Sequence, residues 1–245
     1  NVKDYRRPET IEDAVALVQS LPNAVYIGGG AWTVAQGDPT LETVIDLQNL
    51  GLNIITGTLE NVQIGATASL QAIIDHPDSG TMANGILAKA LSFAQSRNLR
   101  EQGTLGGALV TADAEDPIST ALLVMNTEVH YADPGIHTAP FTSFVAFRDR
   151  LVSTKSRITG GTDSLPPARS GAAFTTVGRS PKDKPIVCAA AYVTVDEGLA
   201  AQIRLAVGGA DQRPVRLHKT EHVLRGQLLD ENRINTALTP ALAEL

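Results

Sequence analysis

Residues 99–117 read LREQGTLGGALVTADAEDP, and the rest of the chain is organised around the glycines at positions 103, 106 and 107. Three glycines within five residues allow positive φ angles and let another group come close to the backbone. Successive amide N–H groups exposed in such a loop form a concavity that suits a phosphate. Glycine turns are also common where no ligand binds. The stretch therefore indicates either a phosphate-binding loop or a tight turn.

An earlier glycine run, Gly28-Gly29-Gly30, follows the apolar segment Ala24–Ile27, which is typical of a strand. The two glycine runs lie about seventy-five residues apart, and together they could hold a pyrophosphate from two sides. A Rossmann dinucleotide motif needs Gly or Ala where this run has Thr33, and no acidic residue follows at the required distance. The sequence therefore argues against a Rossmann fold.

The composition is that of a globular protein, with 245 residues, 43 % hydrophobic and 19 % charged. No apolar run approaches the length needed to cross a bilayer, and a net charge of −6 argues against a nucleic-acid partner. The single cysteine, Cys188, excludes a disulfide within the chain and is too few for an iron–sulfur cluster. The start of the sequence shows no signal-peptide pattern. We therefore expect a cytoplasmic protein with no transmembrane segment.

Periodicity predicts mixed helices and strands up to about residue 158, with a buried helix at 118–125 and a strand at 128–131. The residue pattern then changes to one rich in strand-like runs, and the Gly/Pro-rich stretch 159–167 before it is predicted to be a domain boundary. Three strand-like runs follow, at 172–177, 186–195 and 200–207, and they indicate an antiparallel meander. Two helices are expected after it, near 218–224 and 231–245.

Three further features carry possible chemistry. His218-Lys219-Thr220-Glu221-His222 matches an inverted zinc-protease pattern, but no histidine follows as a third ligand, so a polar surface helix is favoured. Cys188 lies in an apolar strand and is predicted to be a buried thiol without chemistry. The acids Asp113, Glu115 and Asp116 could bind a cation or a ligand hydroxyl, or cap the helix that begins near Pro117.

Taken in order, the motifs resemble those of the FAD-binding medium subunit of the molybdenum hydroxylases, the carbon monoxide dehydrogenase and xanthine dehydrogenase type. The likeness covers nearly the whole chain. It lies in Ile27-Gly28-Gly29-Gly30, in the run from Arg97 to Gly107, and in five other segments: Tyr5-Arg6-Arg7-Pro8-Glu9-Thr10, Gly178-Arg179, Val207-Gly208-Gly209-Ala210, Pro214-Val215-Arg216 and Leu224-Arg225-Gly226.

This resemblance implies an α+β fold in which a two-lobed FAD-binding domain at 1–165, with subdomains at about 1–50 and 51–165, precedes a small α+β domain at 166–245. The second domain is expected to hold an antiparallel three-stranded sheet with helices. The resemblance also implies an electron-transfer subunit in which FAD passes electrons from iron–sulfur clusters to an external acceptor. The partners implied are a large molybdenum-cofactor subunit and a small subunit with 2Fe–2S clusters, as a dimer of heterotrimers. A single chain is then expected to have no activity of its own.

The residues carried over from the family form two loops and one acid. Backbone amides of Gly28 to Ala31 and of Gly106 and Gly107 are expected to hold the pyrophosphate, with a hydroxyl from Thr104 and a polar contact from Asp116. The complete set of expected FAD-binding residues is Ile27, Gly28, Gly29, Gly30, Ala31, Trp32, Thr104, Gly106, Gly107, Ala108 and Asp116.

Several positions depart from the family pattern. Ala31 and Trp32 replace polar residues after the first glycine run, Ala108 replaces Asn or Ser after the second, and Thr175-Thr176 stand where a basic residue is common. An alternative is therefore a structural subunit of the same fold that has lost FAD or binds it weakly. A self-standing flavin oxidase has less support, because no extra substrate domain and no histidine for covalent flavin attachment is found near either loop.

Overall fold

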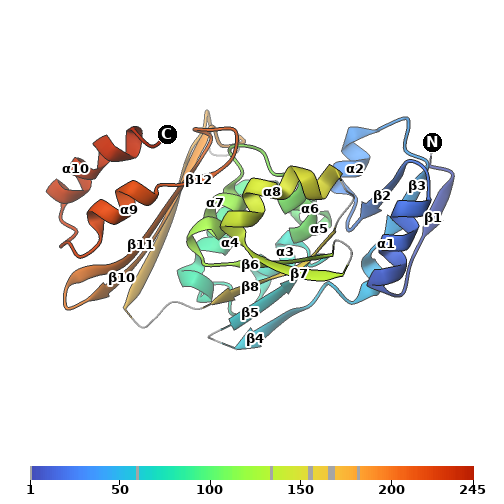
Figure 1. Cartoon of the computed structure of the whole chain (residues 1–245), viewed down its shortest axis with the longest axis horizontal. Helices are drawn as coiled ribbons and strands as arrows, with labels where there is room; N and C mark the ends of the chain where they lie inside the picture. Colours follow the sequence, from blue (N-terminus) through green and yellow to red (C-terminus); the bar gives the residue numbers. More distant parts are fainter. Residues whose placement is uncertain (1, 59–60, 133–134, 154–156, 165–168, 181–182) are drawn as a thin grey trace.

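The computed structural model describes residues 2–58, 61–132, 135–153, 157–164, 169–180 and 183–245. The chain forms three parts in a row, with a small N-terminal lobe at one end, a mixed lobe in the middle and a sheet with two helices at the other end (Figure 1). The two lobes and the final α+β part confirm the predicted fold class.

The N-terminal lobe is a three-stranded parallel sheet in the order β1-β3-β2. Its own small core gathers Ala14 and Val18 of the first helix against Ala24, Ile45 and Leu47. The elements of this lobe are β1 (Asp4–Arg6), α1 (Ile11–Ser20), β2 (Ala24–Ile27), α2 (Ala31–Gln36), β3 (Thr43–Asp46) and the 3-10 turn η1 (Gln48–Leu50).

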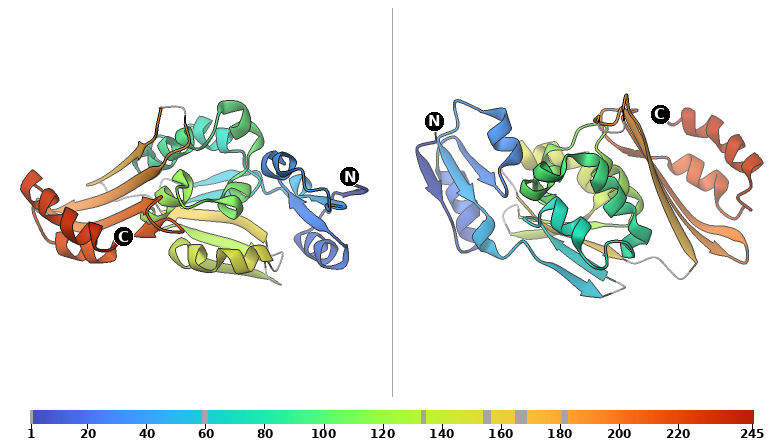
Figure 2. Two further views of the ribbon diagram at one scale, coloured as in Figure 1. Left: turned by 90° about the horizontal axis from the view of Figure 1, so that it is seen from above. Right: turned by 180° about the vertical axis from the view of Figure 1, so that it is seen from behind.

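The middle lobe contains a five-stranded sheet in the order β4-β5-β8-β6-β7, with helices packed around it (Figure 2). Its strands are β4 (Ile55–Thr58), β5 (Asn61–Gly65), β6 (Glu128–Ala132), β7 (Ile136–Pro140) and β8 (Arg157–Ser164). Its helices are α3 (Leu70–Asp75), α4 (Ile86–Ala94), α5 (Arg97–Gln102), α6 (Leu105–Thr111), α7 (Pro117–Val124) and α8 (Phe141–Ser153), with the 3-10 turn η2 (Met82–Gly85) before α4.

Strand β8 differs from the sequence prediction. Residues 159–164 were expected to belong to a boundary segment because they are rich in Gly and polar residues, yet they lie in the middle of the sheet. The strand is paired antiparallel with β5 on one side and with β6 on the other, so the backbone hydrogen bonds of two neighbours stabilise it. The predicted domain boundary at 165/166 falls outside the described residues.

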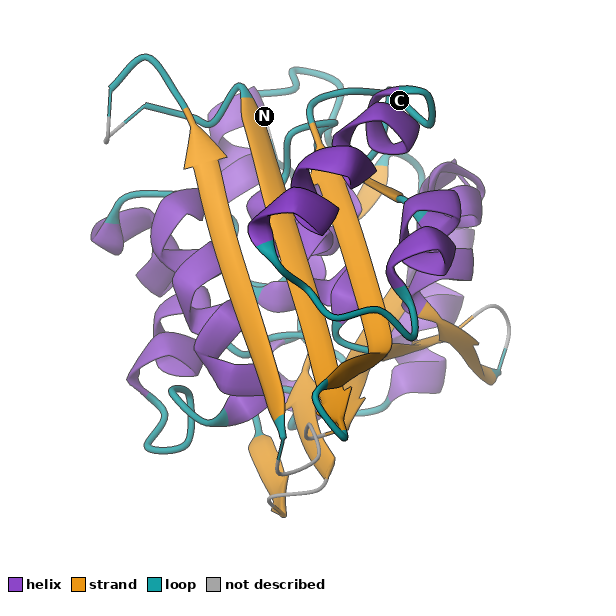
Figure 3. Ribbon diagram, turned by 90° about the vertical axis from the view of Figure 1, so that its left-hand side faces the viewer, coloured by secondary structure: helices purple, strands orange, loops and turns teal. Residues whose placement is uncertain are grey.

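The C-terminal part is an antiparallel sheet in the order β12-β11-β10-β9, with two helices on one face and the helices of the middle lobe on the other (Figure 3). The predicted meander is confirmed, but a short fourth strand extends it beyond the three expected. The elements are β9 (Ser170–Val177), β10 (Val187–Asp196), β11 (Leu199–Gly208), β12 (Val215–Arg216), α9 (His218–Leu224) and α10 (Glu231–Leu242).

Helix α7 joins the middle lobe to the C-terminal sheet. All eight of its residues are buried, and they contact α4 on one side and strands β10 and β11 on the other. Most of these residues are apolar, and the two polar ones, Ser119 and Thr120, are hydrogen-bonded to Asp116, so the helix can lie in the interior of the protein. The main core therefore runs without a break from Leu122 and Val124 of α7 to Phe174, Ala190 and Tyr192 of the C-terminal sheet.

Candidate functional site

The structure brings the two glycine runs into direct contact, although they belong to different lobes. An ideal Cβ on Gly29 would lie 1.6 Å from the carbonyl oxygen of Gln102, and one on Gly28 would lie 2.8 Å from Oγ1 of Thr104. A side chain at either position would overlap the second loop. The glycines at 28 and 29 are therefore required by the close approach of the two loops, whatever ligand binds there.

The first loop carries free backbone donors. Gly30 has a left-handed φ of 79° and begins α2 without a side-chain cap. Within the described residues, no protein acceptor is hydrogen-bonded to the N–H groups of residues 28–33. No residue from 28 to 37 is charged, so no carboxylate in this segment repels an anion. The run of donors suits a phosphate group.

The second loop uses its backbone donors differently. The N–H of Gly106 donates to the carbonyl oxygen of Ala66 at 2.9 Å, and the N–H of Gly107 donates to Oγ1 of Thr104 at 3.2 Å. Gly106 is buried, and an ideal Cβ there would lie 3.0 Å from both the Cβ and the carbonyl oxygen of Ala66. The structure thus gives both amides protein partners, and their role toward a pyrophosphate stays a prediction.

Thr104 lies where the two loops meet. It is 8 % exposed, it is the N-cap of α6, and its hydroxyl oxygen accepts the Gly107 N–H. A hydroxyl that accepts one hydrogen bond still has a proton to donate. The expected contact of Thr104 with a phosphate oxygen is therefore compatible with its capping role.

Asp116 has the capping role that the sequence offered as one alternative. Its carboxylate accepts the Ser119 N–H at 2.6 Å and begins α7, and the carbonyl oxygen of the same residue accepts the Thr120 hydroxyl at 2.8 Å. Burial raises the pKa of the Asp116 carboxyl to about 6, against the lowering effect of the Ser119 hydrogen bonds. Its contact with a flavin nucleotide stays a prediction.

The other two acids of the cluster already have a cation. The ammonium group of Lys184 forms an ion pair with Asp113 and lies 2.8 Å from the Glu115 carboxylate. Lys184 comes from the segment between β9 and β10, so these ion pairs join the acidic loop to the C-terminal domain. Burial lowers the pKa of Lys184, but the two carboxylates outweigh it and the pKa is raised. Within the described residues, no group of three potential metal ligands is found.

The positions that depart from the family pattern lie around the loops. Ala31 starts α2 and is half-buried, whereas the side chain of Trp32 is 52 % exposed. Ala108 follows the two glycines in α6 and is also half-buried. Trp32 therefore does not fill a hydrophobic core, and it is available to a ligand or a partner surface.

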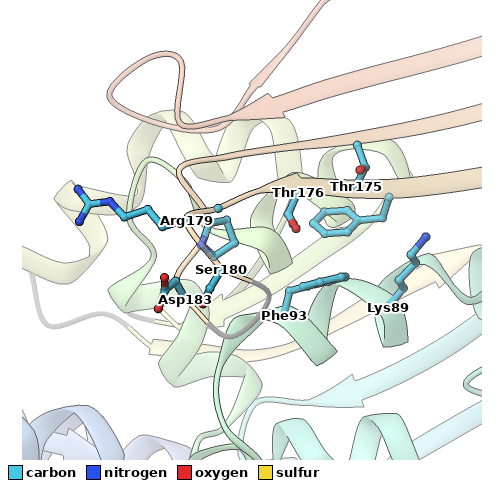
Figure 4. A pocket seen from close by; sticks show the side chains of 10 residues that line it. Lys89, Phe93, Thr175, Thr176, Arg179, Ser180 and Asp183 are labelled. Atoms are coloured by element: carbon cyan, nitrogen blue, oxygen red, sulfur yellow. The ribbon is translucent and has the colours of Figure 1, made fainter.

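A pocket that sequence reasoning missed lies between α4 and β9. It has a volume of about 410 Å³, and its lining includes Phe93 and Phe174, whose ring centroids are 6.0 Å apart. Figure 4 shows Lys89 and Phe93 on the helix and Thr176 on the strand pointing toward them, whereas the side chain of Thr175 points to the other side of the strand. The family pattern places a basic residue at this point of β9, and here the positive groups of the lining come from Lys89 and Arg179. No sequence motif marks the pocket, because its two walls are about eighty residues apart.

The two remaining motifs have structural roles. Glu221 of the His-x-x-Glu-His segment is 4 % exposed; its carboxylate accepts two hydrogen bonds from Arg216, at 2.8 and 2.6 Å, and one from the Leu205 N–H. The predicted helix is confirmed, but its polar face is not wholly at the surface: Thr220 and Glu221 are buried, whereas the apolar Val223 is 44 % exposed. Cys188 is a buried free thiol 3.2 Å from the Thr120 hydroxyl, as expected for a packing residue.

Comparison with protein families assigns both halves of the chain. Residues 1–159 match the family described as FAD binding domain in molybdopterin dehydrogenase, and residues 172–245 match the CO dehydrogenase flavoprotein C-terminal domain. The first match alone covers more than half of the chain. Within the described residues, no helix has the length and apolar character required to span a membrane.

Individual relatives share about a quarter of their aligned residues with this chain. The YgfM protein of Escherichia coli is 26 % identical over 98 % of this chain and 86 % of its own length. The nicotine 6-hydroxylase medium subunit of Paenarthrobacter nicotinovorans is 26 % identical, over 95 % of this chain and 83 % of its own. The carbon monoxide dehydrogenase medium chain of Afipia carboxidovorans is 25 % identical, over 98 % and 85 %.

Solved structures share the fold. A chain of carbon monoxide dehydrogenase from Hydrogenophaga pseudoflava superposes with a TM-score of 0.90 at 21 % identity, over 99 % of this chain and 87 % of that one. Quinoline 2-oxidoreductase from Pseudomonas putida gives 0.87 at 22 % identity, over 98 % and 86 %. The chain belongs to the FAD-binding subunits of the molybdopterin dehydrogenase family, an oxidoreductase family, with the FAD-binding domain of that family followed by the CO dehydrogenase flavoprotein C-terminal domain.

Proposed function

We propose that this chain is an electron-transfer subunit, in which a bound FAD receives electrons from iron–sulfur clusters of a partner and passes them to an external acceptor. The observation that carries the proposal is the meeting of the two loops. The loop that carries the free amides of residues 28–33 contacts Thr104, whose hydroxyl proton remains to be donated, and a site for a pyrophosphate requires such donors close together. A match of residues 1–159 to an FAD-binding domain supports FAD as the dinucleotide.

The roles proposed for the chain's own residues follow from their donors. Amides of Gly28 to Ala31 hold the pyrophosphate, and Thr104 donates its hydroxyl proton to a phosphate oxygen. Ile27 and Trp32 flank these donors and keep water from part of the junction. Gly106, Gly107 and Ala108 form the opposite wall, and Asp116 holds the start of α7 behind it. FAD, when bound, supplies the ability to accept two electrons and release them singly.

We further propose that the partners are a large molybdenum-cofactor subunit and a small 2Fe–2S subunit, assembled as a dimer of heterotrimers in the cytoplasm. The one cysteine of these 245 residues cannot by itself ligate an iron–sulfur cluster, so the proposal assigns the clusters to a partner subunit. The medium-chain and medium-subunit names of relatives at 25–26 % identity support such an assembly. The single chain is then expected to oxidise no substrate.

A second candidate is a structural subunit that keeps the fold without FAD. Two observations favour it. Ala31, Ala108 and Thr175-Thr176 lack the polar or basic side chains of the family pattern, and the amides of Gly106 and Gly107 already have protein partners. The intact free donors of the first loop favour the flavoprotein.

A visible absorption spectrum of the purified chain, before and after incubation with FAD and gel filtration, separates the two candidates. Flavin bands at about one FAD per chain support the electron-transfer subunit. A protein that is colourless after gel filtration and gives no heat of binding when titrated with FAD up to millimolar excess overturns it and leaves the structural subunit. Turnover of a substrate by the chain without added subunits would contradict the proposal that substrate oxidation takes place in a partner subunit.

A further inference from the structure

A buried carboxylate lies behind the first glycine loop. Asp46, the last residue of β3, is 2 % exposed, and its side chain lies among donors rather than against apolar atoms. One oxygen accepts a hydrogen bond from the Tyr5 hydroxyl and forms an ion pair with Nε of Arg7 at 3.1 Å. The other oxygen accepts the backbone N–H of Gln48 at 2.9 Å. Both oxygens of this carboxylate are therefore satisfied within the N-terminal lobe.

Gln48 connects this carboxylate to the loop. Its side-chain oxygen accepts a hydrogen bond from Arg7 at 3.4 Å, and its side-chain nitrogen donates to the carbonyl oxygen of Gly28 at 3.2 Å. Asp46 fixes both the backbone of Gln48 and the guanidinium that orients the far end of its side chain. The Gln48 amide is thus held at each end, and one of those ends is the glycine loop.

The hydrogen bond to Gly28 determines the direction of the next backbone donor. In a trans peptide the C=O and the N–H point to opposite sides, so a Gly28 carbonyl held by Gln48 turns the Gly29 N–H away from Gln48. The Ile27 carbonyl oxygen accepts the Leu47 N–H at 2.9 Å, which turns the Gly28 N–H away from residue 47 in the same manner. Two consecutive donors therefore face away from residues 47 and 48.

We propose that Asp46, Arg7 and Gln48 form a positioning relay that holds the Gly28–Gly29 peptide with its donors turned toward the pyrophosphate of the dinucleotide. This inference rests on the proposed function, since it assumes that the first loop binds FAD. Glycine has more backbone freedom than any other residue, so a loop of three glycines needs external contacts to keep one orientation. The relay supplies such contacts from the side opposite to the ligand, and none of its members touches the ligand.

The expected effect is moderate, because Gln48 is exposed and water competes for its hydrogen bonds. Gln48→Met keeps the length of the side chain but removes its donor. We expect it to weaken FAD binding about threefold to tenfold, the range for one net hydrogen bond. Asp46→Asn releases Arg7 as well and should weaken binding at least as much.

The experiment titrates purified apo-protein with FAD and, separately, measures backbone ¹⁵N order parameters of Gly28 and Gly29 without FAD. The matched control is Gln202→Met, because Gln202 is likewise exposed and accepts a hydrogen bond from an arginine, Arg204, at 3.3 Å, but lies on β11 in the C-terminal domain. We expect the order parameters to fall from the rigid range toward about 0.6 in Gln48→Met only. Melting temperatures of both Met variants should stay at the wild-type value.

Each result supports or overturns the relay. Weaker FAD binding together with lower order at Gly28 and Gly29 supports it. Wild-type affinity or wild-type order in Gln48→Met overturns it while leaving the proposed function intact. A loss of FAD binding in Asp46→Asn without one in Gln48→Met also overturns it, because the effect then does not pass through Gln48. If the wild-type chain takes up no FAD, the proposed function fails and this inference fails with it.

Discussion

The carbonyl oxygen of Gln102 occupies the place where a side chain on Gly29 would begin, 1.6 Å from an ideal Cβ at that residue. Real Cβ atoms do not come so close to backbone oxygen, so one of the two loops would have to move to accommodate any other residue. Loops from two lobes therefore depend on each other for their shape. Gly29 has to be glycine because the two loops pack closely there. Gly107, whose ideal Cβ would meet only Oγ1 of Thr104, is instead a position where a side chain would interfere with a ligand.

Gly29→Ala should disturb the contact between the lobes and the binding of FAD together. Overpacking at a buried contact costs about 1–3 kcal/mol, so we expect a lower melting temperature as well as a large loss of FAD affinity. Gly80→Ala is the control, because no atom lies within 4 Å of its ideal Cβ and its φ is not in the left-handed region. Thermal melts and FAD titration of both variants check the prediction. Wild-type FAD affinity in Gly29→Ala would contradict it.

Gly107→Val should remove FAD binding while the fold survives. Gly107 is exposed, it is helical, and an ideal Cβ would meet only Oγ1 of Thr104, at 3.0 Å. A valine there faces the proposed ligand more than the protein. Gly106→Ala is the comparison, because its Cβ would press on Ala66 and should lower stability. If purified Gly107→Val retains its full flavin content, the assignment of this loop to the dinucleotide is wrong.

Ala108→Asn should tighten FAD binding. The wild-type chain lacks three polar side chains of the family pattern, each worth about 0.5–1.5 kcal/mol of net hydrogen bonding. Together they correspond to roughly a hundredfold in affinity, so we expect FAD in the wild type to be bound but dissociable. Restoring Asn at position 108 should recover about threefold to tenfold. Calorimetry of apo-protein with FAD measures the change, with Ala241→Asn on α10 as a control; an unchanged dissociation constant refutes the prediction.

Asp116→Asn should stabilise the protein at neutral pH. The folded pKa of about 6 exceeds the ordinary value of 3.8, so the stability that this carboxyl contributes is fully present below pH 3.8 and is lost as the pH rises to about 6. The loss amounts to about 3 kcal/mol for a shift of this size. Asn caps a helix nearly as well as Asp and carries no charge. The variant should therefore unfold at higher denaturant concentration than wild type at pH 7 and at nearly the same concentration at pH 4.

Asp230→Asn is the matched control for that comparison. Asp230 caps α10 by accepting the Arg233 N–H at 2.7 Å, but its side chain is exposed. We expect little change in stability at either pH. A gain at pH 7 that is equal in both variants would show that removal of surface charge, and not burial of Asp116, is the cause.

The sequence predicted most of the fold where local chemistry decides it. Asp116 caps α7, one of the roles that its position before Pro117 indicated, and α9 covers the residues 218–224 that were expected to be helical. It could not predict β8, because a strand of Gly and polar residues is stabilised by neighbours that are far away in the chain. The pocket lined by Lys89, Phe93 and Thr175 was not predicted either, because its walls come from segments that are far apart in the chain. The pairing of Gly29 with Gln102 is likewise a matter of tertiary approach, and no local pattern encodes it.

The position of helix α7 limits how chimeras of these subunits can be built. Its eight buried residues contact both the middle lobe and strands β10 and β11. The two segments that match different families therefore share one hydrophobic core and do not form separate packing units. A chimera that took residues 1–159 from one protein and the C-terminal domain from another would bring together two halves of one hydrophobic interior from different parents. We expect such a chimera to fold only when α7 and the C-terminal sheet that it contacts come from the same parent protein. The N-terminal lobe has its own small core and is the better candidate for transplantation.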